Sequence, residues 1–188
     1  RALVSSTNGD GNTAVGYQSQ ITSTISHGNT SLGWETLKLN DGGYNTAIGY
    51  GAMRSANSSN AQSNTALGAS SMAAVTQGQG NTGIGQSALG NITTGDFNTA
   101  IGYFAGWDSG TGAVTGSRNV FIGHKAGRSE TGSDRLIIST NDQNLLYGNF
   151  STGYLQVGRA GLTYGGLGVY GDLGVQFMDD DASHFVSL

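Results

Sequence analysis

The chain has 188 residues and a formal net charge of −4; 33 residues are glycine, only 11% are charged, and proline and cysteine are absent. The lack of cysteine excludes a disulfide-stapled scaffold, and the acidic balance argues against a nucleic-acid-binding protein. No apolar run approaches the roughly 18 residues of a membrane-spanning helix, so we expect no membrane insertion.

A six-residue phrase recurs seven times in the first two thirds of the chain. It reads Asn, Thr, a small residue, a branched aliphatic residue, Gly and then usually an aromatic or polar residue, as in Asn45-Thr46-Ala47-Ile48-Gly49-Tyr50. The copies begin at Asn12, Asn29, Asn45, Asn64, Asn81, Asn98 and Asn119, and the last ends at His124. Short units at this spacing are typical of solenoids, and helical repeats need about 33 residues or more. The spacing therefore predicts an elongated all-β solenoid, or β-roll, of about seven rungs.

Strand alternation sorts the motif into two faces. Thr, the aliphatic residue and the aromatic residue share one face, and Asn, the small residue and Gly share the other. We expect the Thr and aliphatic columns inside the coil, because the seventh copy replaces Thr by the nearly isosteric Val120. The opposite column of small residues would then let the backbone of a second copy approach closely. Its members are Ala14, Ser31, Ala47, Ala66, Gly83, Ala100 and Phe121.

The other motif positions predict turns and ladders. We expect each motif Gly to take a backbone conformation that side chains disfavour, and the Asn side chains to form an amide ladder between rungs. A weaker signal follows each motif, as in Ala52-Met53 and Ala88-Leu89, and marks either a second strand or a tight bend.

We place a domain boundary near residue 130. Residues 1–130 form the predicted repeat solenoid, and residues 131–188 a predicted triple-stranded, β-prism-like shaft segment. Strand-like runs occur at 135–139, 145–147 and 154–157. The six-residue echo at 164–175 has too few aliphatic residues for a single-chain core, so three chains would each supply one face of the prism.

The repeats resemble the Asn-Thr-Ala-Ile-Gly-Tyr arrays of bacteriophage tail fibres over about residues 8–128. They are more distantly similar to the β-roll heads of trimeric autotransporter adhesins. Residues 145–154 look like the segment that follows such arrays in fibres with an endosialidase-type intramolecular chaperone, and 176–188 is similar to a short strand repeat downstream in phage fibres. The resemblance implies a homotrimer, a virion location and a role in host attachment. Because the chain opens at Arg1 without a signal-peptide pattern, we expect a fragment of a longer protein.

No pattern indicates catalysis, a metal or a cofactor. Two glycine patterns of the dinucleotide-binding type, at 78–83 and 166–171, lack the strand–turn–helix context that such a site needs. Asp179-Asp180-Asp181 is interpreted as a polar turn rather than a cation site. The three histidines, His27, His124 and His184, have no metal-ligand spacing. A histidine near a threefold axis could form an ion site across three chains, and His124 is the best candidate, but surface or interface packing is the favoured interpretation.

Aromatic residues are the best candidates for ligand binding. Tyr17, Trp34, Tyr50 and Tyr103 share one motif position, and Trp107 precedes Asp108 in the longest inter-repeat loop. Aromatic faces beside carboxylates and amides suit sugars, so we name Trp107, Asp108, Trp34 and Tyr103 as candidate glycan-binding residues. The alternative is that these rings pack over the glycine-rich coil.

We therefore expect a non-enzymatic, structural and receptor-binding segment of a trimeric phage tail fibre. Its partners would be two copies of itself and a bacterial surface glycan or outer-membrane receptor. The alternatives are a bacterial trimeric surface adhesin located on the cell surface, a fibre-borne glycan depolymerase, and an ice-binding solenoid that uses the Thr column.

Overall fold

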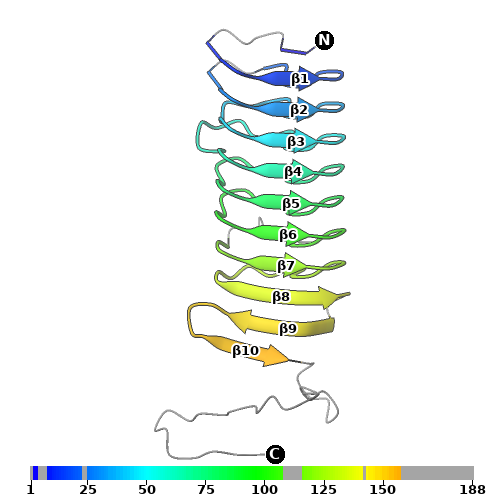
Figure 1. The fold of residues 1–188 in the computed structure, drawn as a ribbon, viewed down its shortest axis with the longest axis vertical. Helices are drawn as coiled ribbons and strands as arrows, with labels where there is room; N and C mark the ends of the chain where they lie inside the picture. Colours follow the sequence, from blue (N-terminus) through cyan, green and yellow to red (C-terminus); the bar gives the residue numbers. More distant parts are fainter. Residues whose placement is uncertain (1, 4–7, 23–24, 108–115, 142, 158–188) are drawn as a thin grey trace, which may run out of the picture.

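The computed structural model describes residues 2–3, 8–22, 25–107, 116–141 and 143–157. Within these ranges the chain is all-β, and ten strands form one sheet in chain order (Figure 1). The strands are β1 (Thr13–Val15), β2 (Thr30–Leu32), β3 (Thr46–Ile48), β4 (Thr65–Leu67), β5 (Thr82–Ile84), β6 (Thr99–Ile101), β7 (Val120–Ile122), β8 (Arg135–Thr140), β9 (Gln143–Asn149) and β10 (Tyr154–Val157). No helix long and apolar enough to cross a membrane occurs in these ranges.

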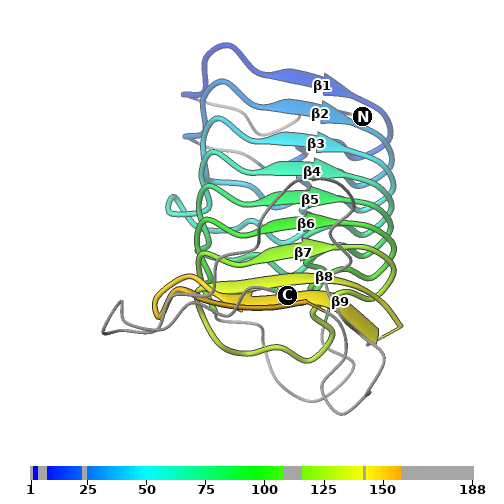
Figure 2. The ribbon, with the colours of Figure 1, turned by 60° about the horizontal axis from the view of Figure 1, so that its bottom comes forward.

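The repeats form a narrow solenoid with one strand per coil. Each strand from β1 to β7 pairs in parallel with the next, and equivalent motif residues face one another, as Thr46 faces Thr65 and Ile48 faces Leu67. Figure 2 shows the coils stacked on one another with all the strands along one side. The predicted all-β solenoid of about seven rungs is confirmed.

The motif Gly ends every strand because no side chain fits at this position. Gly49 has a φ of +125°, and a Cβ there would lie 2.7 Å from the carbonyl oxygen of Gly68 in the next rung. Two further residues with positive φ follow in each coil; in the third coil they are Gly51 and Met53. The signal at Ala52-Met53 therefore marks a tight bend and not a second strand.

The predicted asparagine ladder is present, but it runs through the interior of the coil, whereas we expected the Asn column on the opposite face from the interior. The Oδ1 of Asn64 accepts the backbone N–H of Asn81 at 2.9 Å, and its Nδ2 donates to the carbonyl of Gly78 at 2.8 Å. The same two bonds recur along the array. In the last copy, Oδ1 of Asn119 accepts the backbone N–H of Arg135, and Nδ2 of Asn119 donates to the carbonyl of Gly132. An amide offers an acceptor oxygen and a donor nitrogen on separate atoms, which suits these two bonds and fits the asparagine found in all seven copies.

The core of the solenoid is built from the small-residue column and the bend residues. Ala47, Ala66 and Ala100 are fully buried, as are Met53 and Met72. The motif column that we expected outside the coil is therefore its inner lining, and the prediction was wrong on this point. The coil is too narrow for two large residues in one layer, so a small strand residue faces a large bend residue.

The seventh coil inverts this arrangement of sizes, and its large strand residue also takes up the space at the bend of the sixth coil. Phe121 occupies the small-residue position of β7 and is fully buried, and the bend positions of coils six and seven are Gly106 and Gly127. A Cβ on Gly127 would lie 2.3 Å from the Phe121 ring, and one on Gly106 would lie 2.8 Å from it. The ring thus fills the space that bend leucines and methionines fill in earlier coils.

The sheet continues past residue 130. β8 pairs in parallel with β7, and β9 and β10 then add antiparallel strands. These three strands confirm the runs predicted at 135–139, 145–147 and 154–157. The remainder of the predicted prism, 158–188, with its echo, its aspartates and His184, lies outside the described residues.

Candidate functional site: an exposed threonine and aliphatic face

The outer side of β1 to β7 carries two continuous columns of side chains, which we call the Thr/aliphatic face. One column is Thr13, Thr30, Thr46, Thr65, Thr82, Thr99 and Val120, and the other is Val15, Leu32, Ile48, Leu67, Ile84, Ile101 and Ile122. No member of either column is buried. Five members of the aliphatic column are exposed, from Val15 at 53% to Ile122 at 37%, and the other two, Ile48 and Ile84, are half-buried.

This placement corrects the expectation that Thr and the aliphatic residue point inward. Thr and the aliphatic residue do share one face, and Asn and the small residue share the other, as expected. The face that we expected inside the coil, however, is the outer one. Asn must lie inside to reach the carbonyl groups of the next rung, and alternation then takes the small residue inward with it. Thr and the aliphatic residue are consequently forced outward. The small residues from Ser31 to Phe121 are buried in their own coil, so they cannot contact another chain as we expected.

The Thr/aliphatic face carries no charge. The strands from β1 to β7 contain no charged residue. Charged pairs lie instead in the turns. The Arg118 guanidinium donates two hydrogen bonds to Asp134, at 2.6 and 2.9 Å, and holds the pKa of that carboxyl below its usual value. The hydrogen bond from Lys38, at 2.7 Å, likewise lowers the pKa of Glu35.

Exposed aromatic rings lie just beyond the strands, after the motif Gly. Trp34 packs against Tyr17 of the preceding coil, with ring centroids 4.3 Å apart and planes inclined by 30°. Both rings are about half exposed, as is that of Tyr50. Two or three neighbouring rings of this kind form an apolar platform with polar hydroxyl and indole groups at its edge.

A second aromatic cluster lies four coils further along. Tyr103 contacts Phe104 with ring centroids 4.4 Å apart, Phe104 contacts Trp107 at 4.5 Å, and Tyr103 contacts His124 at 5.4 Å. The structure therefore brings the predicted residues Tyr103 and Trp107 into one cluster through Phe104, which sequence reasoning missed. Trp34 belongs to the separate cluster with Tyr17, and Asp108 lies outside the described residues.

No constellation for metal chemistry is present in the part of the chain that the structure describes. No three His, Cys, Asp or Glu side chains lie close enough there to hold a metal ion. His27 and His124 lie in different coils; His27 Nδ1 accepts the backbone N–H of Asp10 at 3.1 Å.

The fold defines the chain as a β-solenoid repeat protein with one exposed, uncharged, half-apolar face. Comparison with known proteins adds no relative: no protein-family model matches the chain, and neither a curated protein nor a solved structure matches it.

Proposed function

We propose that the chain is a structural and receptor-binding segment of a homotrimeric phage tail fibre that attaches the virion to the bacterial surface. The observation that carries this proposal is the Thr/aliphatic face. Contiguous apolar surface of this extent is typical of an interaction site rather than of a solvent-facing surface. The resemblance of the repeats to tail-fibre arrays supports the same conclusion.

Three copies around one axis suit the geometry of the face. The columns run along the whole array, from β1 to β7, in a constant register. Copies placed side by side around a threefold axis would bring equivalent rungs to the same height, so each aliphatic residue would meet its own equivalents. Closed cyclic symmetry of this kind is usual in homo-oligomers. The trimer would form through the face that we first assigned to the inside of the coil.

The aromatic clusters supply the receptor-binding part of the proposal. They lie at the end of the strands, outside the columns that the trimer would cover. The rings of Tyr17, Trp34 and Tyr103 are exposed and that of Trp107 is half-buried; together with their hydroxyl and indole groups they suit the apolar faces and hydroxyl groups of a surface glycan. A bacterial surface adhesin would use the same features on the cell surface, and a depolymerase would in addition release oligosaccharides from the polysaccharide that it binds.

One observation favours a second candidate function. Thr and a branched aliphatic residue both point outward in every rung from β1 to β6, which gives a regular, uncharged surface of hydroxyl and methyl groups. A monomer that left this face open could adsorb to ice. Thermal hysteresis together with a monomeric mass would favour that function over the fibre.

Sedimentation equilibrium tests the assembly. We expect a mass three times the 19.2 kDa of the chain. Leu67→Asp should dissociate the trimer, because it would bury three uncompensated carboxylates. Leu39→Asp is the matched control, since Leu39 is as exposed as Leu67, at 41% against 44%, but lies outside the strands. A monomeric wild-type chain, or equal effects of the two variants, would contradict the proposal.

Binding to bacterial polysaccharide tests the attachment role. Immobilised surface polysaccharides should retain the wild-type trimer, and Trp34→Ala and Trp107→Ala should weaken this retention without changing the sedimentation mass. Release of oligosaccharides during the incubation would replace the attachment role by depolymerase activity.

A further inference from the structure

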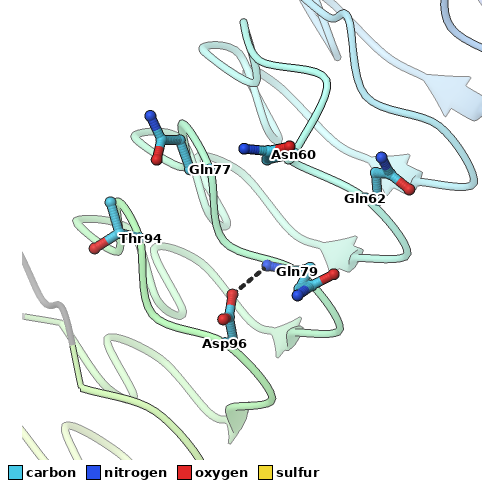
Figure 3. Close-up of a pocket in the computed structure, with 6 residues that line it drawn as sticks. All are labelled: Asn60, Gln62, Gln77, Gln79, Thr94 and Asp96. Carbon is cyan, nitrogen blue, oxygen red and sulfur yellow. Dashed lines mark hydrogen bonds between the residues drawn. The ribbon is translucent and has the colours of Figure 1, made fainter.

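A polar groove lies on the side of the solenoid that leads into β4, β5 and β6. It has a volume of about 390 Å³ and is lined by Asn60, Gln62, Gln77, Gln79, Thr94 and Asp96 (Figure 3). We call it the amide groove, because four of its six lining side chains are carboxamides. None of these residues belongs to the Thr/aliphatic face or to the aromatic clusters.

The groove repeats with the solenoid. Its residues stand four and two positions before the motif Asn in three successive coils that are spaced by 17 residues. They therefore form two short columns, one of Asn60, Gln77 and Thr94 and one of Gln62, Gln79 and Asp96. Neighbouring rungs of a sheet are about 4.8 Å apart, so equivalent side chains present hydrogen-bonding groups at a regular interval along the axis.

Much of this hydrogen-bonding capacity is unused within the chain. The carboxamides of Asn60, Gln77 and Gln79 make no hydrogen bond with other described residues. Asp96 is held in place because its Oδ1 accepts the backbone N–H of Gln79 at 2.9 Å, the bond drawn in Figure 3. This arrangement leaves Oδ2 of Asp96 able to accept a further hydrogen bond.

The lining chemistry excludes most ligand classes. Among the described residues no Lys, Arg or His lines the groove, so no cationic side chain there would pair with a phosphate, a sulfate or an acidic sugar. Amide oxygens can also ligate calcium, but a single carboxylate supplies little negative charge for a calcium site, and no group of three His, Cys, Asp or Glu that could hold a metal ion occurs among the described residues. The lining offers no aliphatic or aromatic side chain to hold a lipid or an apolar peptide residue. What remains is a neutral ligand with many groups that both donate and accept hydrogen bonds.

We propose that the amide groove binds a neutral oligosaccharide, with the sugar chain lying along the solenoid axis. Carboxamides pair with sugar hydroxyls in both directions, since each offers two donors and an acceptor, and Asp96 accepts from a further hydroxyl. The proposal rests on the proposed attachment function and names the ligand class for it.

Titration calorimetry on the whole chain tests the proposal. The probes are three neutral hexasaccharides, of α-1,4-glucose, β-1,4-glucose and β-1,4-N-acetylglucosamine, and an acidic hexasaccharide of galacturonic acid. We expect at least one neutral probe to bind with a Kd of about 1 mM or tighter. This binding should be insensitive to salt because no charge is paired, and the acidic probe should bind more weakly.

A double substitution in one rung locates the binding. Gln77→Ala/Gln79→Ala should weaken the binding of the neutral probe by at least about tenfold, which corresponds to the loss of two or more hydrogen bonds. Gln86→Ala is the control, since Gln86 is an exposed glutamine that follows the same strand, β5, but lies outside the groove. Both variants should keep the wild-type urea midpoint.

Three results would overturn the proposal: binding of none of the neutral probes, unchanged binding in the double variant, or stronger binding of the acidic probe. A lowered urea midpoint in the double variant with unchanged sugar binding would show that the amides serve only as a ladder between rungs. A trimer that binds no neutral sugar would remove the groove proposal alone. A monomeric chain that binds sugar through the groove would remove the trimeric fibre and leave the groove in place.

Discussion

The inner and outer sides of the same three-residue strands differ in whether their side chains are packed and hydrogen-bonded within the chain. On the inner side of β4, Ala66 is fully buried and flanked by an asparagine ladder in which donors and acceptors are paired. On the outer side, Leu67 is 44% exposed and has no charged neighbour in its column. The inner side therefore completes the fold of one chain, and we propose that the outer side meets a partner. The predictions below test this division, from the largest expected effect to the smallest.

The asparagine ladder predicts a large loss of stability on substitution. Asn81→Ala removes the acceptor of the Asn98 N–H and the donor to the Gly95 carbonyl, which lie at 2.9 and 2.8 Å. Two buried backbone groups would lose their partners, so the free energy of unfolding should fall by about 2 to 5 kcal/mol. Urea unfolding measures this loss. Asn57→Ala, at an exposed asparagine in a loop, should change it little, and an equal loss in both variants would refute the ladder.

The seventh coil has a large residue in its strand, Phe121, and a small one in its bend, Gly127. Substitutions at these two positions should therefore have coupled effects on stability. Phe121→Ala should cost about 3 to 5 kcal/mol through the cavity that it leaves. Gly127→Leu should also be strongly destabilising, because its Cβ would lie 2.3 Å from the Phe121 ring.

The double variant Phe121→Ala/Gly127→Leu restores the combination of sizes found in the third coil, at Ala47 and Met53. It should unfold at a higher urea concentration than the Gly127→Leu variant. A double variant whose two costs simply add would show that Phe121 and Gly127 do not share one space.

The position before each motif Asn predicts a stabilising substitution. Ser63 has a φ of +56°, whereas the equivalent position is glycine at Gly11, Gly28 and Gly80. Ser63→Gly should raise the stability by about 0.5 to 1 kcal/mol, because the left-handed conformation disfavours a side chain and suits glycine. Thermal unfolding measures the gain. Ser59→Gly, at a serine without positive φ in the same loop, should give no gain; a gain of equal size there would contradict this account.

The ion pair between Arg118 and Asp134, which lies outside the strands, predicts a small, pH-dependent contribution to the stability of the fold. Arg118 lowers the folded pKa of Asp134 below its unfolded value, so the pair stabilises the fold above the unfolded pKa, about 3.9. This contribution is lost as the pH falls through the folded pKa.

Wild type and Asp134→Asn should consequently differ slightly in urea midpoint at neutral pH and low salt. The difference should shrink as the solution is made acidic or salty. A difference that grew on acidification would contradict the direction of the shift.

Much of the fold could be predicted from the repeat alone. The spacing of Asn45, Asn64 and Asn81 predicts the coil, each strand begins one residue after the Asn, and the motif Gly marks the end of the strand. The side that faces inward could not be predicted, because it depends on a contact across the turn. Asn64 donates to the carbonyl of Gly78, which lies three residues before the next motif copy and outside the six-residue phrase. Hydrophobicity alone predicts that the aliphatic residue faces inward. The coil is too narrow for a large residue on the strand as well as at the bend, so the small residue faces inward instead.

The candidate sites were predictable to different degrees. The Tyr17–Trp34 contact follows from their shared motif position once the coils stack. The link between Tyr103 and Trp107 depends on Phe104, which the motif does not contain. The amide groove had a signal in the sequence, since the 17-residue spacing aligns Gln62, Gln79 and Asp96, but only the structure shows that these linker residues lie together.

The central claim is that the Thr/aliphatic face is covered by copies of the same chain. The chain has no cysteine, so Ile84→Cys places one thiol in the middle of the aliphatic column. Mild oxidation followed by denaturing electrophoresis should give a disulfide-linked dimer for Ile84→Cys, because equivalent residues around the axis would have Cα atoms within about 7 Å. Leu39→Cys should stay monomeric. A chain with Ile84→Cys that remains monomeric under the same oxidation would contradict the account.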